Sequence, residues 1–190
     1  MKVYSGSNHN EAPYASLVSD WFGQAINPAL LFRFELTSSA LIFSATRSHP
    51  ALCHPEARAG IFLAELWKYD VAEFFLTDPI TNHYLEFNLS PEGAHWSAEF
   101  RAPREAIREI NDPAIISQGE RRSDGWNAQA ALPLAWLQEK FHFGPASRLN
   151  ATFILDSPHQ RFLSASDLGE GEPDFHRPDA FPTISIISEW

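Results

Sequence analysis

The chain has 190 residues, a length that suits one domain or at most two very small ones. Hydrophobic residues make up 44% of it and aromatic residues 13%, so it can bury a substantial core and does not resemble a disordered chain. The net charge of -10 argues against a nucleic-acid partner, whose phosphates require a basic surface, and against an anionic membrane surface.

The N-terminal 17 residues contain no continuous apolar segment, so no secretion signal is visible. No apolar run elsewhere approaches the length of a membrane span. We therefore expect a cytoplasmic protein. The single cysteine, Cys53, cannot form an intrachain disulfide, which agrees with a reducing compartment without requiring one.

The first predicted element is a β-hairpin of two strands, residues 29–36 and 40–46. Apolar and polar residues alternate along both strands, and a Thr-Ser-Ser turn joins them. The following loop contains His49, Cys53 and His54, which raises the question of a metal site. A structural zinc site commonly has two short-spaced ligand pairs, and the sequence nearby supplies no second pair, so we expect no metal there.

The centre of the sequence predicts an antiparallel meander of three strands, residues 70–76, 84–89 and 94–101. These stretches are rich in aromatic and aliphatic residues at near-alternating positions, which is typical of strands. The two links, residues 77–82 and 90–93, contain the turn formers Asp, Pro, Asn and Gly. Because both links are short, the three strands should be neighbours in one sheet.

Side chains of a strand point alternately to its two faces, so the meander has two sides. One side should carry Glu73, Tyr84, Glu86 and Asn88, and the third strand should add Arg101 to it. Such a face can hold a polar ligand, although a solvated sheet face is the more common alternative. The positions expected in the core are Phe74, Leu76, Leu85, Phe87, Leu89, Trp96, Ala98 and Phe100.

The stretch that follows is less regular. Residues 103–110 predict a helical turn, because a Pro at the first position is followed by Glu, Ala, Ile and Arg. Residues 113–117 predict a short strand. Alternation then predicts two longer strands, at residues 125–132 and 148–155.

The last elements are a helix and two short strands. Residues 134–141 follow a Pro and precede a Gly-Pro pair, which predicts a short helix. Residues 161–165 and 182–187 predict the final strands. Between them lies an acidic loop from Asp167 to Asp174. Oxygen-rich flexible loops bind calcium, so this loop is a candidate calcium site. Its spacing does not match a helix-loop-helix calcium site, and a solvated loop is the simpler expectation.

Three blocks of this sequence resemble the family 9-like carbohydrate-binding modules and the similar DOMON-like domains. The resemblance covers most of the chain after about Leu30 and implies a β-sandwich that binds a sugar between aromatic side chains. The blocks are LWKYDVAEFFL at residues 66–76, YLEFNLSPEGAHW at residues 84–96 and DFHRPDAF at residues 174–181.

The resemblance also implies roles for individual residues. In such modules a Trp shortly before a D-x-x-E strand stacks on the sugar and the Glu binds its hydroxyls, which corresponds to Trp67 and Glu73 here. A second stacking Trp lies near the C-terminus, and the nearest candidate in this chain is Phe181.

The pattern of about nine to eleven short strands with one or two short helices predicts an all-β fold. We expect a single domain over residues 1–190, a two-sheet antiparallel β-sandwich of the jelly-roll or immunoglobulin-like kind. Its expected function is non-catalytic binding of a mono- or oligosaccharide, with no cofactor; the oligomeric state is left open. The candidate ligand-binding residues are Trp67, Glu73, Tyr84, Glu86, Asn88, Arg101 and Phe181.

Three alternatives stay open at this point. A DOMON-like domain could bind haem or another cofactor, in which case an axial histidine would be His83, His95 or His176. A sandwich could also be a protein-interaction domain with no small ligand. A glycoside hydrolase would need two carboxylates, and in one sandwich class the motif is E-x-D-x-x-E; here Lys68 replaces its leading Glu, which argues against an enzyme.

Overall fold

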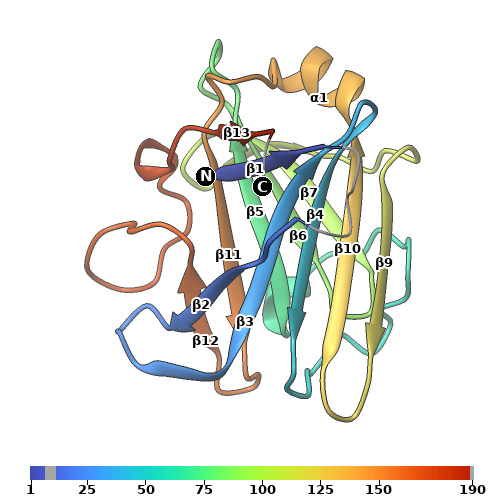
Figure 1. Cartoon of the computed structure of the whole chain (residues 1–190), viewed down its shortest axis with the longest axis vertical. Helices are drawn as coiled ribbons and strands as arrows, with labels where there is room; N and C mark the ends of the chain where they lie inside the picture. The colour runs from blue at the N-terminus through green and yellow to red at the C-terminus, as the bar shows by residue number, and fades with distance from the viewer. Residues whose placement is uncertain (7–11, 189–190) are drawn as a thin grey trace.

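The computed structural model describes residues 1–6 and 12–188. Its strands form two sheets that pack face to face (Figure 1), which confirms the predicted β-sandwich. Sheet A has the strand order β13 (Ser185–Ile187), β1 (Lys2–Ser5), β3 (Ala25–Leu36), β4 (Ala40–Arg47), β10 (Trp126–Pro133) and β9 (Ile116–Arg121), with β2 (Ala15–Ser19) also paired to β3.

Sheet B contains the predicted meander, whose strands are neighbours as expected. All pairs in this sheet are antiparallel, whereas β1 of sheet A runs parallel to both β13 and β3. Sheet B has the strand order β12 (Arg161–Ser164), β11 (Leu149–Leu155), β5 (Val71–Thr77), β6 (Tyr84–Leu89), β7 (His95–Ala102) and β8 (Glu105–Glu109).

The main core fills the space between the two sheets. Aromatic rings from both sheets meet there: Phe34 stacks on Phe43 at 4.9 Å between ring centroids, and Phe74 stacks on Phe87 at 5.1 Å. Phe74 also contacts Phe43 edge-on at 5.3 Å, which joins the sheets directly. The expected core positions of the first two meander strands are therefore confirmed.

A second hydrophobic cluster covers the opposite face of sheet B. The chain segments around residues 51–69 and 162–181 pack onto this face, so every residue of β5, β6 and β11 is buried. This face of the meander is therefore largely covered, which excludes the alternative of an ordinary solvated sheet face. Members of this second cluster are Leu66, Phe75, Tyr84, Trp96, Ala98, Phe100, Ile154, Leu168, Phe175 and Phe181.

The second cluster also corrects the predicted faces of the third meander strand. Trp96 pairs with Asn88 across the strands, and Ala98 pairs with Glu86, so the apolar side chains of β7 share the face of the polar residues. The prediction that Trp96, Ala98 and Phe100 enter the main core is wrong. The physical reason is that both faces of this sheet are buried, so apolarity no longer identifies one face.

The prediction for residues 103–110 is also wrong. This segment forms strand β8, paired with β7, where a helical turn was predicted. Arg104 has a φ of 61° in the tight connection that reverses the chain between these strands. The predicted helix is confirmed as α1 (Leu134–Phe141), which lies at one end of the sandwich (Figure 1).

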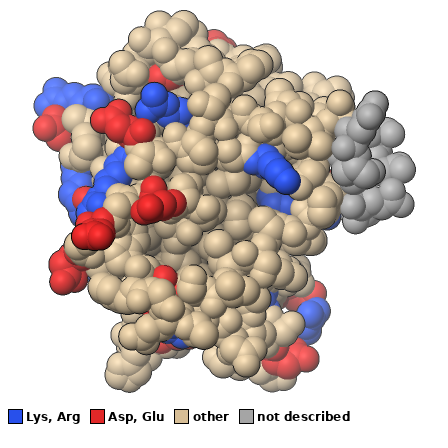
Figure 2. Space-filling view, turned by 60° about the vertical axis from the view of Figure 1, so that its left-hand side comes forward, with Lys and Arg blue, Asp and Glu red and all other residues tan. Residues whose placement is uncertain are grey.

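No helix in the described part of the chain is both long and apolar enough to cross a membrane. Figure 2 shows a face of the molecule where most of the surface is uncharged and where acidic and basic side chains lie intermixed along one side. Such mixing agrees with an acidic chain whose arginines are largely paired with carboxylates.

Candidate functional site

A cavity of about 370 Å³ lies on the outer face of sheet B, within the second hydrophobic cluster. Strands β5 and β6 form its floor, the 3-10 helix η2 (Leu66–Lys68) and β7 contribute aromatic walls, and the C-terminal segment closes one side. The cavity therefore brings together segments from distant parts of the sequence. Its lining residues are Trp67, Glu73, Phe75, Glu86, Trp96, Phe100, Arg104, Ile154 and His176.

Two tryptophans form the aromatic wall at the mouth. Trp67 remains 39% exposed, whereas Trp96 is only 7% exposed, and their rings meet edge-on at 5.6 Å between centroids. Trp67 lies in the short helix η2, which begins after Glu65 in a left-handed conformation. Gln160 Nε2 donates a hydrogen bond of 2.8 Å to the carbonyl oxygen of Trp67, so the backbone below the exposed ring is fixed.

Two carboxyl groups form the floor, and the amide of Asn88 lies beneath them. Glu73 of β5 lies directly opposite Asn88 of β6, and Glu86 lies two residues before Asn88 on the same face. Thr152 Oγ1 donates to Glu73 Oε2 at 3.0 Å, and Asn88 Nδ2 donates to Glu86 Oε1 at 3.2 Å. Both carboxyl groups are nearly inaccessible to solvent, with Glu73 2% and Glu86 7% exposed.

This environment shifts the pKa values of both acids upward. Burial raises the pKa of Glu73 well above its usual range, and the neighbouring Glu86 raises it further. Burial likewise raises the pKa of Glu86 to about 7, although the hydrogen bond from Asn88 and the charge of Arg104 oppose the shift. Both shifts favour the protonated forms, so the pair keeps protons to higher pH than free carboxyl groups do.

Arg104 and His176 add polar groups to the wall. Arg104 Nη2 pairs with Asp174 Oδ1 at 2.9 Å. His176 Nδ1 lies 2.8 Å from the hydroxyl of Tyr84, and its Nε2 lies 3.6 Å from Glu86 Oε2. Burial, reinforced by the charge of Arg104, lowers the pKa of His176 to about 4, so this imidazole is neutral at pH 7.

Four of the predicted ligand-binding residues lie at this cavity or directly beneath it. Trp67, Glu73 and Glu86 line it, and Asn88 holds Glu86 from below. Tyr84 is on the same face but fully buried, where its hydroxyl orients His176. The structure thus gathers most of the predicted face into one site.

Arg101 and Phe181 do not line the cavity. Arg101 is exposed and pairs with Glu105 at 2.8 Å, while Arg104, three residues later, occupies the wall. Phe181 is buried against Phe75, with ring centroids 5.7 Å apart. The aromatic side chain that faces Trp67 is Trp96 instead, which the sequence pattern had assigned to the main core.

The hydrolase motif does not form an acid pair. Asp70 is buried, and its carboxylate accepts hydrogen bonds from the backbone N–H groups of Ser157 at 2.8 Å and Leu52 at 3.4 Å. Lys68 pairs with Glu65 at the surface of η2. Asp70 thus joins two loops, and Lys68 occupies the place of the missing carboxylate.

The histidines weighed as haem ligands lie in three different places. His83 pairs with Glu99, and His95 is buried beside Ser117, with 2.8 Å between Nδ1 and Oγ. His176 alone lines the cavity. Whether any of them binds a cofactor stays a prediction.

The other metal candidates are scattered. Across residues 1–6 and 12–188, no group of three or more His, Cys, Asp and Glu side chains is placed to hold a metal ion. In the acidic loop, Asp174 pairs with Arg104, and Asp167 accepts a hydrogen bond from the backbone of Gly169. Burial raises the pKa of the Cys53 thiol to about 11, which keeps it protonated. Whether the acidic loop binds calcium stays a prediction.

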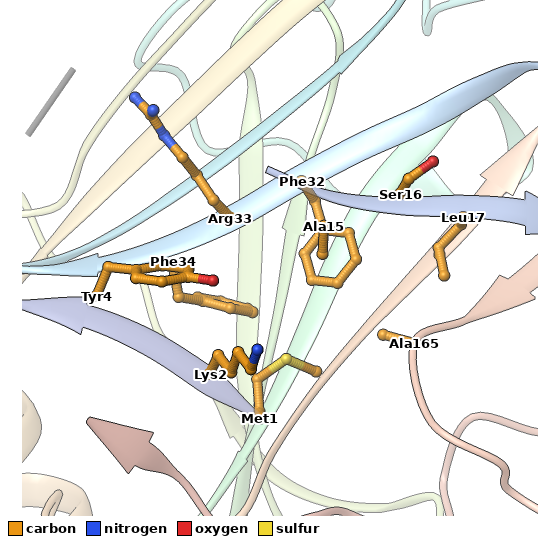
Figure 3. A pocket seen from close by; sticks show the side chains of 10 residues that line it. All are labelled: Met1, Lys2, Tyr4, Ala15, Ser16, Leu17, Phe32, Arg33, Phe34 and Ala165. Carbon is orange, nitrogen blue, oxygen red and sulfur yellow. The ribbon is translucent and has the colours of Figure 1, made fainter. Parts of the chain in front are cut away.

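A hollow of about 200 Å³ on the other side of the sandwich lies between β1, β2 and β3. Its described walls include Met1, Leu17, Phe32 and Phe34, and the guanidinium of Arg33 points away from it (Figure 3). Arg33 Nη1 donates instead to the carbonyl oxygen of Ala12 at 2.8 Å. This hollow offers apolar contact and few convergent polar groups, so the cavity on sheet B is the better candidate for a polar ligand.

No protein-family model matches the chain. The chain is 30% identical over 140 residues to the UPF0462 protein C4orf33 homolog of Rattus norvegicus, an alignment that covers 70% of this chain and 66% of the rat protein. The human UPF0462 protein C4orf33 is 29% identical over 140 residues, with the same coverage. The chain therefore spans slightly less than two thirds of these relatives, and their names give no function.

Solved structures show the fold. A candidate carbohydrate-binding protein from Bacteroides uniformis superposes with a TM-score of 0.69 at 16% identity, over 98% of both chains. A family 9 carbohydrate-binding module from Caldicellulosiruptor kristjanssonii, in complex with glucose, has a TM-score of 0.65 at 11% identity, over 100% of this chain and 97% of that one. The same module was also solved in complex with cellotriose, again with a TM-score of 0.65. The chain has the fold of family 9 carbohydrate-binding modules.

Proposed function

We propose that this chain, with its family 9-like fold, is a non-catalytic carbohydrate-binding domain that holds a mono- or oligosaccharide in the cavity on sheet B. The observation that carries the proposal is the combination of a partly exposed indole, Trp67, with buried carboxyl groups at the cavity floor. The structural neighbours solved with glucose and cellotriose support the same ligand class.

The two parts of the cavity suit the two kinds of surface that a sugar presents. The C–H face of a pyranose ring is apolar and packs on an aromatic plane, which Trp67 provides with support from Trp96. The hydroxyl groups need donors and acceptors, which Glu73, Glu86 and Arg104 provide. A cavity of about 370 Å³ is in the range of small-molecule sites.

Residues below the lining hold these groups in place. Thr152 fixes one oxygen of Glu73, Asn88 fixes one oxygen of Glu86, and Tyr84 fixes the ring of His176. Such support limits the side-chain entropy that a ligand would have to overcome on binding. The site therefore suits a ligand that enters a preformed pocket.

The absence of catalysis is part of the proposal. A retaining or inverting glycosidase needs one ionised and one protonated carboxyl on opposite sides of the scissile bond. Glu73 and Glu86 instead project side by side from adjacent strands on one floor, and Asp70 is occupied by backbone hydrogen bonds. This arrangement favours binding over hydrolysis.

The test is a glycan-array screen of the purified protein, followed by calorimetry with the best-bound sugars. We expect saturable binding that Trp67→Ala abolishes or strongly weakens. The matched control is Phe22→Ala, because Phe22 is an exposed aromatic residue, 62% accessible, outside the cavity lining. Absence of binding to every sugar, or equal loss in both variants, would contradict the proposal.

A further inference from the structure

The floor of the cavity has more hydrogen-bond acceptors than donors. Within the described residues, one oxygen of each carboxyl group has a hydrogen bond, from Thr152 to Glu73 and from Asn88 to Glu86. The second oxygen of each has none. Asn88 Oδ1 is also buried without a hydrogen-bond partner among the described residues. The free oxygens of Glu73 and Glu86 thus face the cavity on adjacent strands, and His176 Nε2, 3.6 Å from Glu86 Oε2, is too far for a hydrogen bond.

The floor also lacks a cation. His176 is neutral at pH 7 because burial and the charge of Arg104 lower its pKa to about 4. Arg104 lies at the wall, where its charge acts on Glu86 from a distance while its ion pair is with Asp174. Among the described residues, neither Glu73 nor Glu86 forms an ion pair with a lysine or arginine, so a cationic ligand group would add a partner that the floor lacks.

We propose that the ligand carries a primary amine, so that the cavity binds an amino sugar in its free, non-acetylated form, with the ammonium group between Glu73 and Glu86. This inference rests on the proposed function and narrows its ligand class. An ammonium carries several N–H donors and one positive charge, which match the free oxygens of Glu73 and Glu86, the two carboxyl groups that line the cavity. The apolar face of the same sugar would still pack on Trp67.

The same floor disfavours other sugars. An N-acetyl group offers one donor and no charge, and a uronic acid or sugar phosphate would place a further negative charge beside two acids. A neutral hexose can donate its hydroxyl protons to the same oxygens, but it brings no positive charge to the two acids. Selectivity for the amine therefore follows from charge as well as from hydrogen bonding.

Proton release should accompany binding of the amine. Burial favours the protonated forms of the free acid pair, whereas an ammonium between the two groups favours their ionised forms, so binding should release protons from the pair. Among the other groups near the pair, the pKa of His176 is about 4, that of Tyr84 is about 12, and the pKa of Asp174, the partner of Arg104, is lowered, so none of these three titrates between pH 5 and 8. Affinity for the amine should then rise from pH 5 to pH 7.

The experiment is calorimetry of the whole chain at pH 7 with three matched sugar sets: glucose, galactose and mannose, each as the plain hexose, the 2-amino sugar and the N-acetylated amino sugar. Glucuronic acid is added as an anion. Titrations in two buffers of different ionisation enthalpy count the protons released. We expect at least one amino sugar to bind about tenfold or more tightly than its plain and acetylated counterparts, the scale of one buried charge-assisted hydrogen bond, with net proton release.

The outcomes separate the inference from the proposed function. If plain or acetylated sugars bind as tightly as the amines, the amine inference is overturned and sugar binding stands. If no sugar of any set binds, the proposed function fails as well. Glu73→Gln removes one charge with little change of shape, so it should reduce the preference for the amine to near the level of the plain hexose. Glu86→Gln serves as a second variant should the first fail to fold, and an unchanged preference in the folded variant would overturn the inference.

Discussion

Replacing Trp67 by alanine removes the exposed ring of the cavity mouth and separates binding from stability. The ring contacts Trp96 edge-on at 5.6 Å and is 39% exposed. Because η2 is a surface turn that can relax, we expect the variant to lose about 1–2 kcal/mol of unfolding free energy. For a chain of this size that corresponds to a fall in Tm of about 2–8 °C.

Loss of the same ring should also weaken sugar binding directly. One aromatic contact with its buried area contributes about 1–3 kcal/mol to a complex, which is a roughly 5- to 150-fold increase in Kd. Calorimetry gives the Kd, and differential scanning calorimetry gives the Tm. The comparison variant is Trp126→Ala: Trp126 is 1% exposed in the main core, and its truncation should cost about 3–5 kcal/mol of stability. A stability loss in Trp67→Ala as large as that in Trp126→Ala, or a Kd unchanged within twofold, would refute the assignment of Trp67 to the site.

Three further predictions follow from the floor and its supports. The protein should not hydrolyse aryl glycosides, and turnover that disappears in a folded Glu73→Gln variant would contradict this. Burial raises the pKa of Glu86 from 4.5 to about 7, so the folded state binds more protons than the unfolded state between these pH values. The unfolding free energy should therefore fall as the pH rises from 5 to 8. Glu86→Gln should reduce that fall, and urea titrations at pH 5 and pH 8 measure it. Asp70→Ala should cost about 1–3 kcal/mol, because it leaves the partly buried N–H of Ser157 without its acceptor. An unchanged urea midpoint would argue against that role.

The sequence predicts the elements of the sandwich well where a local pattern, such as alternation or a turn signal, is enough to define the element. The alternation in residues 84–89 gives the correct strand, and the Pro and Gly signals around residues 134–141 give the correct helix. The pairing of Glu73 with Asn88 across β5 and β6 follows from the short turn between the strands. These features depend on local chemistry, which a single sequence contains.

The site could be predicted only in part, because distant segments complete it. Trp96 is one of the apolar side chains of β7, which would point into the main core if only one face of sheet B were buried. Segments distant in the sequence cover the other face as well, and Trp96 lies on that face. Arg104 reaches the cavity through the tight turn between β7 and β8, which the helix-like composition of residues 103–110 conceals. His176 lies in a block with a family resemblance, but no periodicity in the sequence places it beside Glu86.

The central claim is that a sugar binds in the cavity beside Trp67, and NMR of the indole N–H signals tests it most directly. The protein is labelled with nitrogen-15 and titrated with the hexoses and amino sugars, with each tryptophan signal assigned by substitution. We predict saturable shifts of the Trp67 and Trp96 signals, because both rings line the cavity, while the signal of Trp126 in the main core stays in place. Unchanged signals of Trp67 and Trp96 with every sugar, or saturable shifts confined to tryptophans outside the cavity, would contradict the claim.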